Sequence, residues 1–266
     1  MNSAPVFRAW QQGAQRIGWQ VTVDDWAADV AVIWSMLWRG RMRGNREVWQ
    51  AYRDSGRPVI VLEVGMLQRG MTWKMGVNGT TASASWITAY DPLRPSKIGI
   101  QTDAWRQRGD HVLIALQRSD SEQWRDLPAT DIWLQQTLST LSMHTDRAVR
   151  IRPHPRQRTR LPVDAAVSMP RILANTYDSF DLQRDFDRAW AVINVNSGPG
   201  SQAIISGVPA FVHADSLAAP VANLDLCQIE NPQCPDREQW LTQVSHTEWT
   251  ISELQTGEPQ SRLPLH

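Results

Sequence analysis

The sequence lacks several features that would assign it to a special class of protein. It has 2 cysteines, Cys227 and Cys234, with no His at ligand spacing, so we expect a reducing compartment and no metal site. Its 27 basic residues balance 27 acidic ones, so a polyanion has to be held by a local patch. The longest apolar stretches, 31–38 and 191–195, are too short to span a bilayer, and the N-terminus has no signal-peptide pattern. We therefore expect a cytoplasmic protein without a membrane partner.

Tyrosine and phenylalanine are also scarce, with 3 and 4 residues, whereas tryptophan occurs 14 times. Tryptophan offers a flat surface on which bases and sugars stack, but it also fills protein cores. We expect most of these tryptophans to pack in the core and a few at most to face a ligand. A chain of 266 residues can form one large domain or two of Rossmann size.

The N-terminal half predicts an α/β arrangement. Segments 29–34 and 58–63 are apolar on both faces, as strands of a parallel sheet covered by helices are. Apolar residues at helical spacing in 39–55 lie between them and predict a parallel strand, helix, strand unit. The other elements expected in this half are a helix at 6–17, a strand at 19–23, an irregular segment at 65–90 and a connector at 91–110.

The C-terminal half repeats this alternation. We expect strands at 111–116, 148–152, 190–195 and 209–213, with helices at 129–143, 181–188 and 200–206. The fold class is therefore predicted as α/β, with two Rossmann-like lobes that face a cleft, an N-terminal lobe of residues 1–108 and a C-terminal lobe of residues 109–266. Ligands of such sheets bind beyond the carboxyl ends of the strands, so the residues after each strand are the candidates for chemistry.

The most informative motif is a Gly-rich turn between the strand at 190–195 and the following helix. Its glycines allow a tight turn, and its polar side chains stand where the helix begins. Free amides and the positive end of the helix dipole suit a diphosphate. The alternative is an ordinary connection with a polar cap. The candidate phosphate-binding residues of this turn are Ser197, Gly198, Gly200, Ser201 and Gln202.

A second motif follows the strand at 148–152. Arg152 and His154 alternate with Pro153 and Pro155, which stiffen the exit from the strand. An arginine can bind phosphate oxygens through two parallel bonds, and a histidine can donate to them. A lone histidine beside prolines is otherwise a common loop residue. Gln117, just past the strand at 111–116, is a further candidate for the donor phosphate.

Together, the Arg-Pro-His-Pro strand end and the Ser-Gly-rich turn followed by Gly-x-Pro resemble those of two-lobed (GT-B-like) nucleotide-sugar glycosyltransferases, such as capsule-polysaccharide transferases. The resemblance covers about 148–212. It implies that the turn, Arg152 and His154 bind the phosphates of a nucleotide-sugar co-substrate, a UDP-sugar by our prediction, with no other cofactor. The family often has Glu where this chain has Gln202. No Asp-x-Asp pair ends a strand in the central region, which disfavours the metal-dependent type of transferase.

The N-terminal half resembles short glycosyltransferase-like proteins of tailed phages. The matching motifs are Asp-Val-Ala-Val-Ile-Trp at 29–34, the Arg-rich helix start, Val-Leu-Glu-x-Gly at 61–65 and Trp-x-x-Gly-x-Asn-Gly at 73–79. This resemblance implies transfer of a sugar to a hydroxymethylated pyrimidine in double-stranded phage DNA, in the cytoplasm of an infected bacterial host.

The residues after the strand at 29–34 include a local basic patch. Four arginines and a tryptophan fall within nine residues, beside glycines that allow close approach to DNA phosphates. The alternative is a solvated helix start whose arginines pair with Glu47 and Asp54. The candidate acceptor and DNA contacts are Arg39, Arg41, Arg43, Arg46, Trp73 and Asn78, with Lys74 and Trp38 as weaker ones.

Sugar transfer also needs a base that takes the proton of the acceptor hydroxyl. Glu63, at the carboxyl end of a buried strand, is the first choice. Asp25, and after it Asp24, are the reserves, because they follow the expected strand at 19–23. A carboxylate in such a place also commonly anchors the next loop. Two other functions stay open: a transferase for a surface polysaccharide or small acceptor, and a noncatalytic DNA-binding or sugar-binding protein on the same scaffold.

Overall fold

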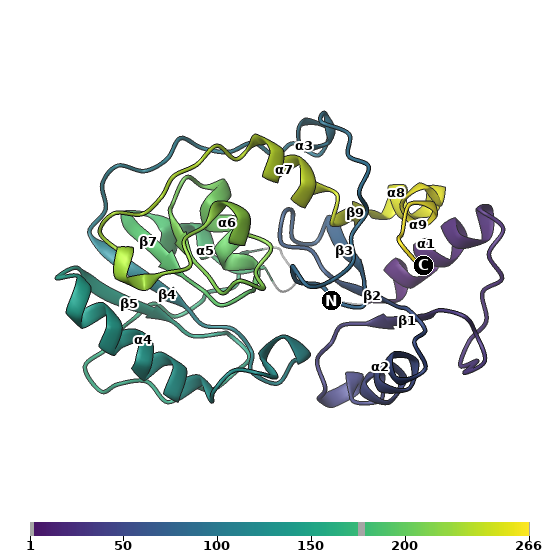
Figure 1. Ribbon diagram of the computed structural model, residues 1–266, viewed down its shortest axis with the longest axis horizontal. Helices are drawn as coiled ribbons and strands as arrows, with labels where there is room; N and C mark the ends of the chain where they lie inside the picture. Colours follow the sequence, from purple (N-terminus) through teal and green to yellow (C-terminus); the bar gives the residue numbers. More distant parts are fainter. Residues whose placement is uncertain (1–2, 175–178, 266) are drawn as a thin grey trace. The chain divides into compact units, whose positions relative to one another are not determined.

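The computed structural model describes residues 3–174 and 179–265. Contacts within the chain divide it into two compact units, which we describe one at a time. Unit 1 consists of Met1–Gly99 and Thr242–His266, and unit 2 consists of Ile100–Leu241. The division falls inside helix α7 (Glu238–Ser245). Figure 1 labels the elements of both units.

Unit 1 is built on a mixed four-stranded sheet with the order β1-β2-β3-β9. The strands are β1 (Ala31–Trp34), β2 (Val59–Val64), β3 (Thr72–Val77) and β9 (Glu248–Thr250). The parallel pairing of β1 with β2 confirms the predicted strand, helix, strand unit. The pairings of β2 with β3 and of β3 with β9 are antiparallel, so the sheet is not the parallel Rossmann-like sheet that we expected.

Two further predictions for this unit are wrong. Residues 19–23 are not a strand, because Trp19 and Val21 pack against the core without a neighbouring strand to pair with. The segment 65–90 is not irregular throughout, since it contains β3. The apolar side chains of β3, Trp73, Met75 and Val77, alternate with Lys74 and Gly76, which is the two-residue period of a strand, and all of β3 is buried.

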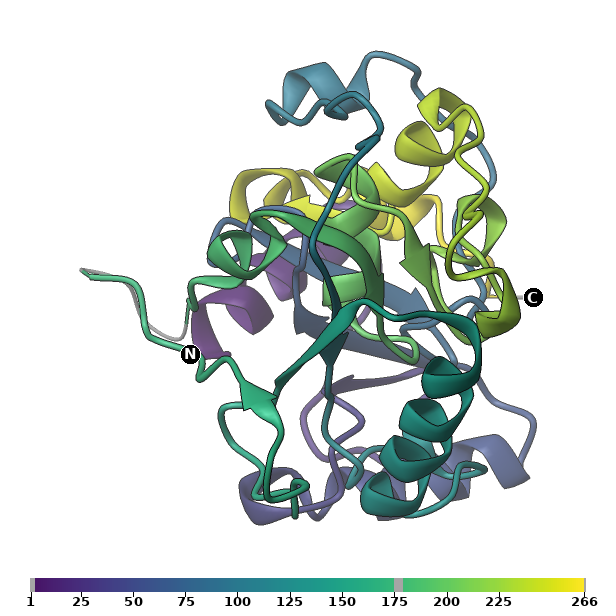
Figure 2. The ribbon, with the colours of Figure 1, turned by 90° about the vertical axis from the view of Figure 1, so that its left-hand side faces the viewer.

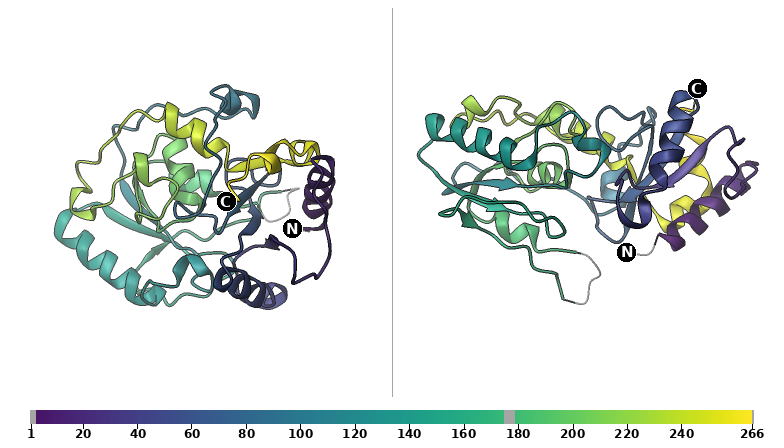
Figure 3. Two further views of the ribbon diagram at one scale, coloured as in Figure 1. Left: turned by 45° about the vertical axis from the view of Figure 1, so that its right-hand side comes forward. Right: turned by 90° about the horizontal axis from the view of Figure 1, so that it is seen from below.

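Helices cover both faces of the sheet in unit 1. On one face, α1 (Ala4–Arg16) and α8 (Ile251–Thr256) enclose a core that includes Trp10, Trp73 and Trp249. On the other face, α2 (Asn45–Asp54) covers the β1 and β2 half with Trp49 and Tyr52. Figure 3 shows α1 in purple beside the C-terminal helices in yellow. The remaining short helices of this unit are η1 (Gly40–Met42), α3 (Arg94–Lys97) and α9 (Glu258–Ser261).

The C-terminal residues belong to unit 1 because they complete its sheet and core. Arg94 holds them in place: its guanidinium donates to the carbonyl oxygens of Ser245 (2.8 Å) and Glu248 (2.6 Å), pairs with Glu253 and stacks on Trp249 at 3.9 Å. The expected division into 1–108 and 109–266 differs from the observed one at both boundaries. Unit 2 begins at Ile100 instead of residue 109, and it ends at Leu241, because the chain then returns to unit 1.

Unit 2 is a fully parallel five-stranded sheet with the order β6-β5-β4-β7-β8. Numbered within the unit, this order is 3-2-1-4-5, that of a doubly wound dinucleotide-binding sheet. The strands are β4 (His111–Ala115), β5 (Ala148–Arg152), β6 (Ala166–Val167), β7 (Ala189–Ile193) and β8 (Ala210–Phe211). The Rossmann-like prediction is therefore confirmed for the sheet of this unit.

Helices lie on both faces of this sheet, with α4 on one side and α5 and α6 on the other (Figures 1 and 3). Figure 2 views the strands with α4 in teal beside them. Leu134 and Leu141 of α4 pack on Val112 and Ile151. The helices are α4 (Thr130–His144), α5 (Leu182–Phe186) and α6 (Gly198–Ile205), with 3₁₀ turns η2 (Glu122–Trp124), η3 (Ala219–Val221) and η4 (Leu226–Gln228). No helix in the described part of the chain has the length and apolarity that crossing a membrane requires.

Candidate functional site

The carboxyl edge of β4 and β7 is the candidate site of unit 2. From β4 the chain continues through α4 to β5, and from β7 it continues through α6 to β8, so the two connections diverge on opposite sides of the β4 and β7 pair. This is the topological switch point of a doubly wound sheet, where a crevice forms outside the strand ends. The residues that follow β4 and β7 are therefore the ones that a ligand would meet.

Gln117 and Asn196 join the two strand ends. The Gln117 amide donates to Asn196 Oδ1 at 2.6 Å and accepts from the Asn196 backbone N–H at 3.0 Å. Asn196 Nδ2 also donates to the carbonyl oxygen of Gln123 at 3.0 Å. Both side chains are buried. Gln117 follows β4, and its amide holds the turn after β7 in place.

The turn at the start of α6 is organised by Asn194. Its Oδ1 accepts from the backbone N–H of Ser197 at 2.9 Å, and its Nδ2 donates to Ser197 Oγ at 3.0 Å and to the carbonyl oxygen of Ala115 at 2.8 Å. The N–H of Gly200 bonds to the Ser197 carbonyl oxygen at 3.3 Å, and Pro199 has no N–H. The N–H of Gly198 forms no hydrogen bond within the described residues.

This arrangement leaves the helix tip with fewer donors than expected. Of the first turn, the N–H of the half-buried Gly198 remains as a group that can turn to an anion, whereas Ser197 Oγ donates to Asn194 Oδ1 at 3.3 Å. Gly200 and Ser201 are buried, and a side chain at Gly200 would meet Val212 at 3.0 Å. Gln202, half-buried in the next turn, is engaged with a neighbour. The sequence analysis missed Asn194 and Asn196, whose signal was the polar Asn-x-Asn that directly follows an apolar strand.

Arg152 has partners other than the predicted phosphate. Its guanidinium is buried and pairs with Asp185 and, at 3.4 Å, with Asp181. Asp185 also accepts from Ser168 Oγ. Two carboxylates therefore neutralise the Arg152 cation: Asp185 belongs to α5, and Asp181 directly precedes this helix. We correct the assignment accordingly: Arg152 fastens the end of β5, because its charge is already satisfied inside the protein.

His154 lies past the end of β5, half-buried, and its Nδ1 accepts from the backbone N–H of Arg156 at 3.1 Å. That bond assigns the proton of the neutral ring to Nε2, and His154 is also engaged with a neighbour. The same loop is tied to the residues after β4, since Gln157 Oε1 accepts from Ser119 N–H at 2.8 Å and Gln157 Nε2 donates to Ser119 Oγ at 2.9 Å. The loops after β4, β5 and β7 are thus one hydrogen-bonded edge.

Three exposed arginines of this loop were missed by the sequence analysis. Arg156, Arg158 and Arg160 alternate with polar residues just after His154. The spacing Arg-x-Arg-x-Arg directly after a strand end was the available signal. Guanidinium groups bind phosphate oxygens well, so these arginines give this edge of the sheet the positive charge that Arg152 does not supply.

In unit 1, Glu63 lies at the carboxyl end of β2, half-buried, where its Oε1 accepts from the Val64 N–H at 3.1 Å. It pairs across the sheet with Lys74, which pairs in turn with Glu248. Asp25 and Asp24 do not follow a strand. Asp25 is exposed, and its Oδ1 accepts from the Ala27 N–H at 3.0 Å, so this carboxylate closes a surface turn. The reserve assignment is corrected on this ground.

The basic patch of unit 1 follows β1. Arg39, Arg41, Arg43 and Arg46 are all exposed. Asn45 donates to the carbonyl oxygen of Trp34 at 2.5 Å and thereby fixes the start of α2 at the end of β1. Within the described residues, no ion pair joins Arg41, Arg43 or Arg46 to Glu47 or Asp54, and Asp54 accepts from Gln50 at 2.7 Å instead.

Two predicted acceptor contacts have structural roles. Trp73 is 8% exposed and packs in the core against Met75 and Trp249. Asn78 has a φ of 59°, and its Oδ1 and N–H both bond to the backbone of Val59, at 2.9 and 2.7 Å. Asn78 therefore ends β3 by pairing with the start of β2. Neither Trp73 nor Asn78 is placed to contact an acceptor.

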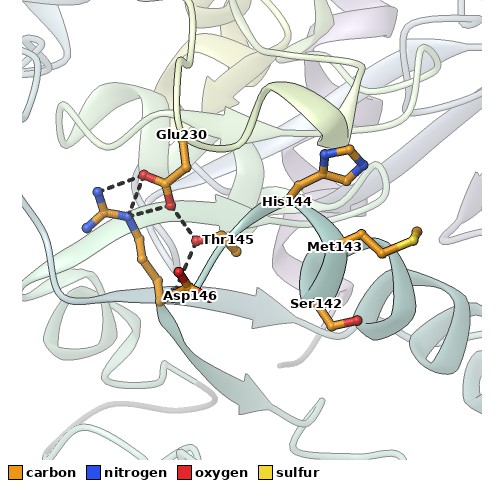
Figure 4. A pocket seen from close by; sticks show the side chains of 7 residues that line it. Ser142, Met143, His144, Thr145, Asp146 and Glu230 are labelled. Carbon is orange, nitrogen blue, oxygen red and sulfur yellow. Dashed lines mark hydrogen bonds and ion pairs between the residues drawn. The ribbon is translucent and has the colours of Figure 1, made fainter.

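A cavity of about 590 Å³ lies at the opposite edge of the unit 2 sheet (Figure 4). Its lining comes from the end of α4 and the start of β5, where Arg147 pairs with Glu230 at 2.9 Å. Doubly wound sheets bind ligands at the carboxyl edge, so this cavity is not part of the candidate site. Among the described residues, no group of three or more His, Cys, Asp or Glu side chains is placed to hold a metal ion.

No protein-family model matches the chain, and no curated protein matches it. Two solved structures from Thermosulfurimonas dismutans resemble it. The KpsC beta Kdo 2,4 transferase is 13% identical, with a TM-score of 0.48, over 81% of this chain and 78% of that one. The KpsC beta Kdo 2,7 transferase is also 13% identical, with a TM-score of 0.42, over 87% of this chain and 85% of that one.

Proposed function

We propose that the chain is a glycosyltransferase that moves a sugar from a nucleotide-sugar donor to an acceptor hydroxyl. The observation that carries the proposal is the strand order of unit 2, 3-2-1-4-5, with the Gly-rich turn of α6 at its switch point. Nucleotide phosphates bind at such a helix start in doubly wound sheets. The cleft between two lobes is part of the same proposal.

The donor's diphosphate takes the edge formed by the loops after β5 and β7. The Gly198 N–H donates to a phosphate oxygen, His154 Nε2–H adds a second donor, and the exposed arginines after His154 supply positive charge. Ser197 Oγ, which donates to Asn194 Oδ1, holds the turn in place. The leaving diphosphate then departs with its charge met by protein donors, as a metal-independent reaction requires. Gly200, Ser201 and Gln202 shape the turn, and a UDP-sugar is the proposed donor.

The acceptor side of the proposal concerns unit 1. Glu63 takes the proton of the acceptor hydroxyl, and the acceptor is a hydroxymethylated pyrimidine in double-stranded DNA. Support for DNA comes from the basic patch after β1, where Arg41, Arg43 and Arg46 are exposed and have no ion-pair partner among the described residues. Such arginines neutralise backbone phosphates without any net charge on the whole protein.

The donor site is tested with matched histidine variants of unit 2. His154→Ala removes the proposed donor, whereas His144→Ala removes an exposed histidine at the opposite edge of the same unit. We expect His154→Ala to weaken UDP binding about tenfold, the value of one hydrogen bond to a charged group, and His144→Ala to leave it unchanged, by calorimetry. Equal UDP affinity in both variants and the native protein would remove the assigned donor site.

Transfer itself is tested with a radiolabelled UDP-sugar offered with hydroxymethylated DNA, a glycan or neither. Label on the DNA supports the proposed acceptor. Label on the glycan alone keeps the glycosyltransferase and moves the acceptor to a surface polysaccharide. Thermal stabilisation by DNA or a glycan with no turnover of any sugar nucleotide would leave a binding protein on this scaffold.

A further inference from the structure

A polar cluster lies on the half of a unit 1 sheet face that α2 does not cover. Met75 and Val77 of β3 point to the core below α1, so Lys74 and Gly76 point to the opposite face. On that face α2 covers Ile33, Val59 and Val61, which belong to β1 and β2. Glu63, at the end of β2, is the cross-strand neighbour of Lys74.

Trp86 lies on the same face as Lys74. Val77 and Ser85 exchange backbone hydrogen bonds of 3.1 and 2.9 Å in an antiparallel bridge, so Gly76 and Trp86 are the next neighbours along it. Ile87, one residue further, joins Met75 in the core, which confirms the alternation. A Cβ at Gly76 would meet the Trp86 ring at 2.9 Å, so the indole lies against this glycine.

Lys74 is buried, and its charge interacts with the carboxylates of Glu248 and Glu63. It is 8% exposed, and no hydrogen bond or ion pair joins its ammonium group to another described residue. Glu248, its neighbour on β9, is fully buried and occupied, since its carboxylate accepts from Met66 N–H at 2.7 Å, Leu67 N–H at 3.0 Å and Thr72 Oγ1 at 2.7 Å. Burial lowers the pKa of Lys74, while Glu248 and Glu63 oppose this shift.

Burial of a lysine side chain is costly, and Lys74 is held beside the carboxylates of Glu248 and Glu63. Glu63 and Trp86 are both half-buried, unlike Glu248, and their side chains lie on the same face as Lys74. Glu63 Oε1 accepts from the Val64 N–H, and Glu63 Oε2 forms no hydrogen bond with a described residue. A donor, an acceptor and a flat apolar surface therefore occur together on one patch of unit 1.

We propose that Trp86, Lys74 and Glu63 form the acceptor subsite, which takes a ring that carries a free hydroxyl group. The ring lies on the indole of Trp86, and the hydroxyl oxygen accepts from the Lys74 ammonium while its proton faces Glu63. In transfer, that proton goes to the Glu63 carboxylate, the oxygen forms the new bond to the anomeric carbon, and the diphosphate leaves with the electrons of the broken bond. The transfer step of this inference rests on the proposed function, whereas binding of the hydroxylated ring to the subsite does not.

The chain offers a direct probe of this subsite, because Lys74 and Lys97 are its two lysines. Protein labelled with ¹³C and ¹⁵N at lysine gives two side-chain NMR signals, assigned with Lys74→Arg and Lys97→Arg. Lys97 is exposed and serves as the internal control. The ligands are methyl pyranosides and 5-hydroxymethyl-2′-deoxycytidine, which share the ring and the hydroxyl. We expect one of them to shift the Lys74 signal and leave that of Lys97 in place.

Variants then separate the subsite from a purely structural role. Trp86→Ala is expected to weaken binding of the responding ligand about tenfold, which is the value of one stacking contact. Trp26→Ala removes another indole of unit 1, which is 51% exposed, and is expected to leave the affinity unchanged. Glu63→Gln keeps the shape of the side chain and is expected to retain ligand binding. Circular dichroism and urea unfolding show whether each variant is folded. The shift of the Lys74 NMR signal is measured on the native protein and does not depend on the folding of any variant.

The outcomes separate the two proposals. A pyranoside response assigns a sugar acceptor, and a nucleoside response assigns the modified base. No shift of the Lys74 signal with any of these ligands, or an equal loss of affinity in Trp86→Ala and Trp26→Ala, overturns the subsite, even if UDP still binds to unit 2. A Lys74 response without any sugar transfer leaves the subsite standing and removes the glycosyltransferase.

Discussion

Gln117 and Asn196 exchange two hydrogen bonds across the carboxyl ends of β4 and β7, one of 2.6 Å between the side chains and one of 3.0 Å from the Asn196 backbone. The pair spans the switch point of the unit 2 sheet. It fixes the path of the turn that leads into α6, because the backbone of Asn196 itself is one of the bonded groups. Donor binding in the proposed function depends on that path.

Replacing Gln117 by Leu should therefore destabilise unit 2 and weaken nucleotide binding together. The buried Asn196 side chain and backbone N–H lose their partner, which costs about 1–3 kcal/mol per unsatisfied group. Urea unfolding measures the loss, and UDP calorimetry measures binding. Gln135→Ala, at an exposed glutamine on α4, is the matched control and should change neither quantity. Additive costs in Gln117→Leu with Asn196→Ala would show that the two residues do not act as a pair.

Arg94→Met should loosen the C-terminal residues from unit 1. Arg94 is 5% exposed, and its guanidinium donates to the carbonyl oxygens of Ser245 and Glu248, pairs with Glu253 and stacks on Trp249. Its loss leaves the half-buried Glu253 without its cation and two carbonyl oxygens without their donor, at a cost of about 1–3 kcal/mol for each unsatisfied group. Hydrogen exchange should report faster exchange in β9 and α8. Lys97→Met breaks an exposed pair with Asp91 and should cost at most about 1 kcal/mol. Unchanged protection of β9 in Arg94→Met would refute this role.

The sequence predicts unit 2 better than unit 1, and the reason is local. Val112, Ile114, Val192 and Ile193 lie in continuous apolar runs, so strands buried on both faces can be recognised without knowing their neighbours. In unit 1 the pairing of Trp73 with Trp249 joins residues far apart in the sequence. No local pattern reveals such a contact, and β9 itself has three residues.

The grouping of the strand ends could be predicted from the sequence, whereas the partners of their side chains could not. The strand ends that carry Gln117, His154 and Ser197 do form one bonded edge, because parallel strands place their carboxyl ends together. Arg152 shows the limit of this reasoning. Its partner Asp185 lies on α5 and its charge is neutralised there, which depends on packing that the Arg-Pro-His-Pro pattern does not contain.

Acidification should destabilise unit 1 through His246. Nε2 accepts from the Asp91 N–H at 3.0 Å and Nδ1 donates to the Thr242 carbonyl oxygen at 2.8 Å, so the neutral ring is fully bonded. Burial lowers the pKa of His246 below its usual 6.5, with Arg94 and Arg262 acting in the same direction. A group whose folded pKa is lowered in this way binds its proton more readily when unfolded, so stability is lost as pH falls below about 6.5.

The measurement is urea unfolding at pH 7.5 and pH 5.0. His246→Phe should be less stable than the native protein at the higher pH, because the Asp91 N–H loses its acceptor, and should lose less stability on acidification. His144→Phe, at an exposed histidine, should keep the native pH dependence. The same pH dependence in His246→Phe as in the native protein would show that another group is responsible.

The basic patch after β1 should determine any affinity for DNA. Arg41→Ala with Arg43→Ala removes two exposed cations that have no ion-pair partner among the described residues, so nothing inside the protein compensates for them. Each phosphate contact releases condensed counterions, and the slope of log affinity against log salt should fall by about 0.9 per contact. Fluorescence anisotropy with duplex DNA at several salt concentrations gives both the affinity and the slope.

A matched control is Arg8→Ala with Arg16→Ala, which removes two exposed cations of α1 and therefore the same net charge. If the patch binds DNA, the α1 variant keeps the native slope while the variant after β1 loses about two units of it. Equal losses would mean that net charge alone governs binding. If the native protein has no measurable affinity for duplex DNA at low salt, the patch does not bind DNA. That outcome would favour an uncharged acceptor for Glu63, such as a glycan.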